Sequence, residues 1–288
     1  MSPDHAPTIA HTLLRLQSRG LDRLDAQLLL LHLLKRSANE RAWLLAHDVD
    51  LVDTHVLPHL EALVQRRLHG EPLAYLTGHK EFYGLNLQVD ARVLVPRPDT
   101  ETLVEWALQV LPPDADATAT APAVLDLGTG SGAIALALKA TRPALQLTAI
   151  DDSAGALAVA QYNARHLKLD VRFSQGAWFA GLPDANARFQ VIVSNPPYIA
   201  AHDQHLAALT HEPLQALTSG ADGLDDIRCI ITQAPTHLLP GGWLLLEHGY
   251  DQASRVRGLL QDAGLTQVQS RRDLSGIERC SGGQAPTD

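Results

Sequence analysis

The sequence is poor in cysteine, and this scarcity excludes two kinds of small scaffold. Cys229 and Cys280 are the only cysteines in 288 residues, and neither belongs to a CxxC pair or to a Cys/His cluster. Two isolated thiols cannot build a disulfide framework or a structural zinc site. We therefore expect a protein of a reducing compartment that holds no metal.

Long hydrophobic runs are also missing. No stretch of about 18 apolar residues occurs, which is the length that a membrane-spanning helix requires. The first residues, Met1 to His5, lack the basic region and the apolar region of a signal peptide. We predict a cytoplasmic protein that does not associate with membranes.

Positive charge is scarce. The chain has 23 Lys and Arg residues against 32 Asp and Glu residues, a formal net charge of −9. Tight sequence-independent binding of nucleic acids needs Lys and Arg to displace counterions from phosphates. The charge balance therefore argues against direct DNA binding. The remaining composition, with 45% hydrophobic residues, is that of an ordinary globular protein, and the length suits two domains.

The first part of the chain has helical periodicity. From about Thr8 to His69 the apolar residues recur at helical spacing, as Leu24, Leu28 and Leu31 do. Several short helices packed as a bundle account for this pattern. We assign residues 1–77 to an N-terminal helical domain, which is structural or docks a partner.

Turn residues and short alternating runs follow this helical region. We predict a β-hairpin linker over residues 78–96, with two short strands joined near Asp90-Ala91. The stretch from Pro112 to Pro122 is rich in Ala, Asp, Thr and Pro, and we expect a mobile surface loop there. Residues 282–288 are predicted to form a disordered tail.

After Pro122, strand and helix signals alternate regularly. This alternation predicts an α/β domain over residues 97–281 with a parallel, doubly wound, Rossmann-like sheet. The predicted strands are 124–127, 147–150, 171–173, 190–194 and 243–247, with shorter ones at 266–271 and 277–280, and the predicted helices are 132–141, 153–167, 224–238 and 251–263.

A glycine-rich loop joins the first of these strands to the first helix. It reads Asp126-Leu127-Gly128-Thr129-Gly130-Ser131-Gly132. Glycine permits positive φ angles and a close approach of the backbone to a cofactor. The spacing is GxGxG rather than the GxGxxG of dinucleotide enzymes, and no GxxxxGK[ST] phosphate loop is present.

An acidic residue ends the second predicted strand. Asp151 stands about 20 residues beyond the glycines, where a carboxylate can accept hydrogen bonds from ribose hydroxyls. Together the loop and Asp151 indicate a nucleoside-containing cofactor. The alternative is that the glycines form an empty turn and that Asp151 caps the next helix.

The tetrapeptide Asn195-Pro196-Pro197-Tyr198 follows the buried run 191–193. Ligands of open α/β sheets bind outside the carboxyl ends of the strands, which is where this tetrapeptide falls. By itself it could be a proline turn that ends a strand. Its residues also suit a clamp for a planar amide or amine.

The clamp has a physical rationale. An amide nitrogen is a poor nucleophile, because its lone pair is delocalised into the carbonyl group. If the Asn195 side-chain oxygen and the Pro196 carbonyl accept its two hydrogens, the nitrogen is oriented and becomes more electron-rich. The two prolines stiffen the loop and bring no competing N–H donors. Tyr198 can lie against the planar target.

These motifs resemble those of known enzymes. Residues 125–132 resemble the first motif of class I S-adenosylmethionine-dependent methyltransferases, Asp151 matches their ribose-binding acid, and Asn-Pro-Pro-Tyr is similar to the motif of those that methylate a planar nitrogen. With Gly78-His79-Lys80-Glu81-Phe82-Tyr83-Gly84 and Val95-Pro96-Arg97-Pro98-Asp99-Thr100-Glu101, the chain resembles the HemK/PrmC family over roughly residues 24–279.

The resemblance implies a protein-(glutamine-N5) methyltransferase that acts on the Gly-Gly-Gln motif of peptide chain release factors and supports translation termination. The helical domain would dock the release factor. The implied contacts to S-adenosyl-L-methionine are Gly128, Thr129, Gly130, Ser131, Gly132, Asp151, Trp178 and Asn195. Residues Asn195, Pro196, Pro197 and Tyr198 would hold the substrate glutamine, and Asn195, Pro196 and Tyr198 would be catalytic.

Some roles stay open. Asp126 either helps to hold the methionyl end of the cofactor or caps its own turn. Trp178 packs against adenine or is an ordinary core residue. The stretch before Glu212-Pro213 departs from the family's Gly-Asp-(Leu/Val)-Arg-like pattern, which affects a loop on the substrate side. The predicted tail contains Gly282-Gly283-Gln284, the tripeptide that such an enzyme would modify.

Other functions remain as alternatives. The same clamp serves nucleic-acid amino methyltransferases acting on adenine N6 or cytosine N4, although the acidic charge argues against them. A non-catalytic cofactor-binding module and an NAD-dependent oxidoreductase are the further alternatives. We expect the enzyme to be a monomer.

Overall fold

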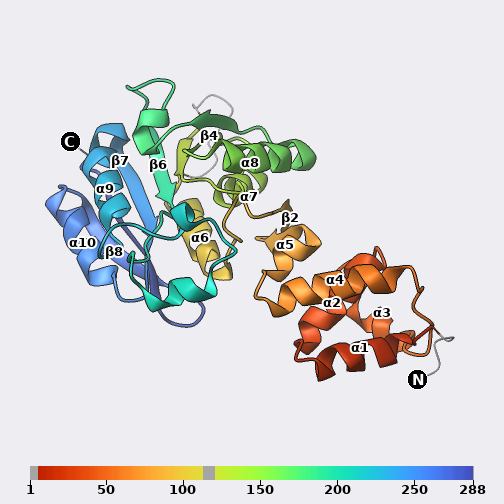
Figure 1. The fold of residues 1–288 in the computed structure, drawn as a ribbon. Coiled ribbons are helices and arrows are strands. Elements are labelled where there is room, and N and C mark those ends of the chain that lie inside the picture. Colours follow the sequence, from red (N-terminus) through yellow and green to blue (C-terminus); the bar gives the residue numbers. More distant parts are fainter. Residues whose placement is uncertain (1–5, 113–120, 288) are drawn as a thin grey trace. The chain divides into compact units, whose positions relative to one another are not determined.

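The structure is a computed structural model that describes residues 6–112 and 121–287 (Figure 1). It divides into one compact unit up to His79 and a second from Lys80 onward. Two sequence predictions concern residues outside these ranges. One is the prediction from residues 1–5 that there is no signal peptide, and the other is most of the loop predicted over residues 112–122.

The first unit is helical. Its elements are α1 (Ile9–Ser18), α2 (Arg23–Leu33), α3 (Arg41–Ala46), α4 (Val56–Leu68) and α5 (Leu73–Thr77). The leucines at helical spacing form its core, with Leu16, Leu29 and Leu30 fully buried. Thr8 is the N-cap residue of α1, and its side chain accepts a hydrogen bond from the His11 N–H, as expected for a threonine at this position.

No helix among the residues that the structure describes is long and apolar enough to cross a membrane.

The second unit starts with a hairpin of β1 (His79–Phe82) and β2 (Leu85–Gln88). The turn lies at Tyr83-Gly84, so the predicted turn near Asp90-Ala91 and the predicted strand at Val93 and Val95 are wrong. Both turn residues have positive φ angles, 49° and 77°, as a tight two-residue hairpin turn requires. Glu101 fixes this turn, because its carboxylate accepts a hydrogen bond of 3.0 Å from the Tyr83 N–H.

A seven-stranded sheet with the order β5-β4-β3-β6-β7-β9-β8 forms the rest of this unit. Its strands are β3 (Ala123–Leu127), β4 (Gln146–Asp151), β5 (Arg172–Gln175), β6 (Phe189–Ser194), β7 (Leu238–Glu247), β8 (Thr266–Arg272) and β9 (Glu278–Gln284). The first five in this order pair in parallel, and β9 is antiparallel to both of its neighbours. The α/β, doubly wound fold class is therefore confirmed.

Helices cover both faces of the sheet, because side chains of a strand alternate between its faces. Val124 packs with α6 (Glu101–Val110), α7 (Ala133–Thr141) and α8 (Ala154–Leu167). Its neighbour Leu125 packs on the other side, with α9 (Asp225–His237) and α10 (Ala253–Asp262). Short 3₁₀ turns complete the unit: η1 (Pro98–Thr100), η2 (Trp178–Gly181), η3 (Gln204–Ala208) and η4 (Leu214–Ala216).

The predicted disordered tail over 282–288 is wrong, because Gly282, Gly283 and Gln284 belong to β9. Gly282 pairs with Leu245 on one side and with Gln269 on the other, and both glycines are buried. The Gln284 side chain is held as well. Its amide donates to the Gly241 carbonyl at 2.8 Å and its oxygen accepts from Gln267 at 2.6 Å. The absence of side chains lets β7 and β8 approach this strand, so glycine here reflects packing rather than disorder.

Gly282→Ala should therefore destabilise the protein. A Cβ atom at this position would lie 2.7 Å from the Leu244 carbonyl oxygen and 2.6 Å from a Leu245 methyl group, so the sheet would have to shift. We expect the free energy of unfolding, measured by urea denaturation, to fall by about 1 to 3 kcal/mol. The matched control is Gly258→Ala inside α10, where nothing lies within 4 Å and stability should rise. Equal stability of the two variants would contradict this packing.

Candidate active site

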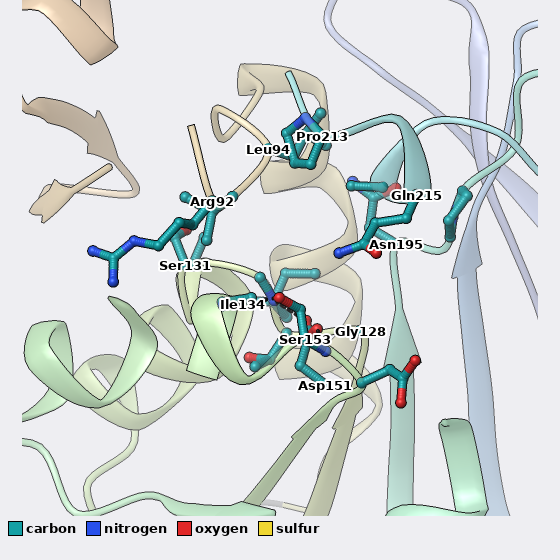
Figure 2. Close-up of a pocket in the computed structure, with 18 of the residues that line it drawn as sticks. Arg92, Leu94, Gly128, Ser131, Ile134, Asp151, Ser153, Asn195, Pro213 and Gln215 are labelled. Carbon is teal, nitrogen blue, oxygen red and sulfur yellow. Dashed lines mark hydrogen bonds between the residues drawn. The ribbon is translucent and has the colours of Figure 1, made fainter. Parts of the chain in front are cut away.

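A cavity of about 320 Å³ opens at the carboxyl ends of β3, β4 and β6 (Figure 2). The strand register brings these ends together, because Leu127 pairs with Ile150 of β4 and with Ser194 of β6. The glycine loop, Asp151 and Asn195 each follow or end one of these strands. Figure 2 shows Arg92 and Asn195 on opposite sides of the cavity, with the Arg92 guanidinium directed away from it.

The glycine loop forms a tight turn at the floor of this cavity. The N–H groups of Gly128 and Thr129 both donate to the Ile150 carbonyl at 2.9 Å, which binds the loop to β4. Gly128 has a φ angle of +72°, and a Cβ atom there would lie 3.3 Å from the Trp178 ring. Glycine is therefore required at this position for its backbone conformation and for the approach of Trp178. Gly128, Thr129, Gly130, Ser131 and Trp178 all line the cavity, whereas Gly132 does not line it and is the N-cap residue of α7.

Asp151 lies at the end of β4 and lines the cavity. Its two carboxylate oxygens accept hydrogen bonds from the Gly130 N–H at 2.8 Å and from the Ser153 N–H at 2.9 Å. Burial raises the pKa of this carboxyl, and the two backbone hydrogen bonds oppose that shift. Asp151 thus organises the glycine loop and the start of α8, and its half-buried side chain still faces the cavity. The sequence left two roles open for Asp151, namely binding ribose hydroxyls and capping the next helix. One carboxylate can make both kinds of contact at the same time.

Asp126 does not line the cavity. It is fully buried behind the loop, where its Oδ2 atom accepts a hydrogen bond of 2.6 Å from the Thr129 hydroxyl. Burial raises the pKa of Asp126 to about 7. Of the two roles left open by the sequence, this geometry favours the one in which Asp126 caps its own turn.

Within the Asn-Pro-Pro-Tyr segment, residues 195 and 197 line the cavity and residues 196 and 198 do not. Pro196 is buried. The Tyr198 hydroxyl donates to Glu247 Oε1 at 3.3 Å, and the Tyr198 carbonyl accepts a hydrogen bond of 3.0 Å from the Gln252 side chain. Burial raises the pKa of the Tyr198 hydroxyl. Its predicted contact with a planar substrate stays a prediction.

Several residues around the cavity were not predicted from the sequence. Thr100 is 4% exposed, and its hydroxyl accepts a hydrogen bond of 3.3 Å from the Asn195 amide. Gln215, the middle residue of η4, also lines the cavity. Thr100 lies inside the motif that carried the family resemblance, so its position could have been singled out. Nothing in the sequence around Gln215 signals a site residue.

Glu212 holds the segment that carries Gln215. Its side chain is 3% exposed and forms an ion pair with Arg97, while its Oε2 atom accepts a hydrogen bond of 3.1 Å from the Val95 N–H. The stretch that departs from the family pattern therefore ends in a buried anchor. This anchor ties the cavity wall at Pro213 to the segment that follows the hairpin.

Asn163 joins the hairpin to the glycine loop. The side chain, 2% exposed, exchanges two hydrogen bonds with the backbone of Gln88, at 2.8 and 3.0 Å. Its amide also donates to the Ser131 carbonyl at 2.9 Å. A single buried amide thereby satisfies the unpaired edge of β2 and fixes the end of the loop.

Comparison with known proteins identifies both units. Residues 106–254 match the family described as the methyltransferase small domain, and residues 8–78 match the PrmC N-terminal domain. The release factor glutamine methyltransferase of Bordetella pertussis is 52% identical over 92% of this chain and 95% of its own length. The protein of the same name from Coxiella burnetii is 47% identical over 89% of this chain and 90% of its own length.

Among solved structures, a methyltransferase from Pyrococcus furiosus superposes with a TM-score of 0.53 and 18% identity. The superposition covers 77% of this chain and 97% of that protein. At this identity the likeness concerns the fold alone.

Glu212→Ala should loosen the cavity wall. The change removes the acceptor of the Val95 N–H and the partner of Arg97. We expect a loss of about 2 kcal/mol in the free energy of unfolding. Amide hydrogen exchange in residues 204–216 should also become faster. Glu212→Gln is the control, since it keeps an acceptor and should lose less. Wild-type exchange rates in the alanine variant would show that this anchor does not hold the segment.

Proposed function

This chain belongs to the release factor glutamine methyltransferases, and on that premise we propose that it transfers a methyl group from S-adenosyl-L-methionine to a release factor glutamine. The relatives' name gives release factor glutamine as the target. From the family resemblance, we assign the acceptor as the side-chain amide nitrogen (N5) of the glutamine in the GGQ motif. One observation carries the proposal. The cavity is lined both by a glycine loop with its acidic partner Asp151 and by Asn195 of the Asn-Pro-Pro-Tyr segment.

The residues at the cavity floor fit S-adenosyl-L-methionine. Gly128 and Trp178 both line the cavity and lie close together, so a bare backbone and an aromatic side chain adjoin there, which suits a flat base. The half-buried Asp151 offers carboxylate oxygens to ribose hydroxyls. Gly128 to Gly132, Asp151, Trp178 and Asn195 are the residues we propose to hold the cofactor. When bound, it supplies an activated methyl group on a cationic sulfur.

The clamp prepares the acceptor nitrogen. Asn195 Nδ2 is engaged by Thr100, so the Asn195 side-chain oxygen is left to accept one hydrogen of the substrate amide. We assign the other hydrogen to the Pro196 carbonyl, although Pro196 is buried and only its neighbour Pro197 lines the cavity. Tyr198 completes the substrate-binding segment. Two accepted hydrogen bonds localise the lone pair on nitrogen and fix its direction.

Positioning accounts for a large part of the expected rate. Holding two reactants in an aligned geometry contributes on the order of 7 to 11 kcal/mol, so a strong base is not needed. The surplus proton leaves the amide after methyl transfer, when the nitrogen has become cationic and acidic. The protein partner, the monomeric state and the cytoplasmic location that the sequence suggests are part of the same proposal.

Purified enzyme should label a release factor when given the cofactor with a radioactive methyl group. A release factor with GGQ changed to GGA should stay unlabelled, because the acceptor nitrogen is gone. DNA and RNA serve as the competing substrates. Labelling of nucleic acid without labelling of the release factor would replace this function by the amino methyltransferase alternative.

Asn195→Ala should lower kcat about a hundred-fold, since the substrate amide loses one acceptor and its alignment. Binding of the release factor should change little. Asn186→Ala, on an exposed loop, is the matched control and should behave as wild type. An unchanged kcat in the Asn195 variant would remove the clamp from the mechanism.

A further inference from the structure

A buried carboxylate lies behind the clamp, and no step described so far uses it. Glu247 ends β7 and is 1% exposed. Its Oε1 atom accepts a hydrogen bond of 3.3 Å from the Tyr198 hydroxyl. The Thr100 hydroxyl also interacts with the carboxylate, although no hydrogen bond to Oε2 is formed among the described residues. Burying an incompletely paired carboxylate lowers the stability of the fold. This cost suggests that Glu247 is kept for a role in function.

Glu247 interacts with both ends of the clamp. It meets Tyr198 directly, and it meets Asn195 through Thr100. The Thr100 hydroxyl accepts from Asn195 Nδ2 at 3.3 Å, and the same hydroxyl interacts with Glu247 and lowers its pKa. Thr100 is itself buried, so bulk water does not compete for these contacts.

The chemistry of these groups fixes the direction of each hydrogen bond. An ionised carboxylate can only accept, so the single hydrogen of the Thr100 hydroxyl turns towards Glu247. Thr100 then offers only lone pairs to Asn195. As a result the Asn195 NH₂ group must face Thr100, and its carbonyl oxygen must face the cavity. Without this constraint the Asn195 amide could rotate by 180° and present a donor to the substrate.

We propose that Glu247 is a positioning residue that holds Asn195 and Tyr198 in the orientation that accepts the substrate amide. The inference rests on the proposed function, because it assigns a role within that reaction. Glu247 contacts neither substrate nor cofactor. It acts through Thr100 and through the Tyr198 hydroxyl.

Several charged or titratable groups surround Glu247. Tyr198 approaches from the clamp, Asp99 from η1, and Arg279 and Cys280 from β9. Burial raises the Glu247 pKa from 4.5 to about 7, while Thr100 and Arg279 oppose the shift and Asp99 adds to it. Only the ionised form is an obligate acceptor. Turnover should therefore contain a component that rises with pH through about 7.

The same shift has a stability consequence of opposite sign. The folded state binds the Glu247 proton more tightly than the unfolded state does, so this group favours folding below pH 4.5 and that contribution is lost as pH rises to about 7. Replacing the glutamate by neutral glutamine should remove this loss of folding stability. At pH 8 the glutamine variant should therefore be less active than wild type and at least as stable.

The test is Glu247→Gln, assayed by methylation of the release factor at pH 6 to 9. Glutamine has a donor NH₂ group in place of one of the two acceptor oxygens, so it is no longer an obligate acceptor towards both hydroxyls. We expect kcat to fall about ten-fold, with the rise near pH 7 absent. The thermal midpoint at pH 8 should equal or exceed that of wild type. Asp126, whose pKa is also about 7, is retained, so the comparison isolates Glu247.

Thr100 provides a matched pair of variants. Thr100→Val removes the hydroxyl at nearly constant shape and should lower kcat to the level of the glutamine variant, whereas Thr100→Ser keeps the hydroxyl and should restore most of it. A wild-type kcat and pH profile in Glu247→Gln would overturn the proposal, as would a loss of activity explained by a lower thermal midpoint. Absence of methylation by the wild-type enzyme would instead reject the proposed function.

Discussion

The parallel pairing of β3 with β4 on one side and β6 on the other is the constraint on which the site depends. This register ends three strands at the same edge. The loops that leave them carry the glycines, Asp151 and Asn195, although these residues are far apart in the chain. Backbone hydrogen bonds from Gly128 and Thr129 to Ile150 then lock the first loop to the second strand. The cavity is therefore a product of sheet geometry, and its side chains refine it.

Local sequence patterns were sufficient for the part of the fold that depends on local periodicity. The strands and helices from Val124 to Ala263 follow from the alternation of apolar runs and capped helices, and the structure confirms their kind and order, although β7 begins at Leu238 and not at the predicted residue 243. Asp151 and Asn195 could be located because strand ends of a parallel sheet converge at one edge. The glycine loop was recognisable because its backbone conformation admits few other residues.

Features that depend on contacts distant in sequence were missed. The hairpin turn at Tyr83-Gly84 is stabilised by Glu101, which lies 18 residues away, so the local pattern pointed to Asp90 instead. The glycines of β9 suggested disorder because their reason, the close approach of two neighbouring strands, is visible only in three dimensions. Gln215 lines the cavity through packing that no motif encodes, and the contact between Thr100 and Asn195 joins residues 95 positions apart.

The position of Gly282-Gly283-Gln284 bears on how the enzyme distinguishes itself from its substrate. The proposed target motif has the same sequence, Gly-Gly-Gln. In this protein, however, the tripeptide lies in β9, with β7 on one side and β8 on the other. A strand inside a sheet is released only when much of the domain opens, at a cost approaching the global stability of about 5 to 15 kcal/mol. Protection against self-modification would then come from folding cooperativity and not from the shape of the pocket. A substrate tripeptide, by contrast, must be available without unfolding, so exposure of the motif is itself a determinant of specificity.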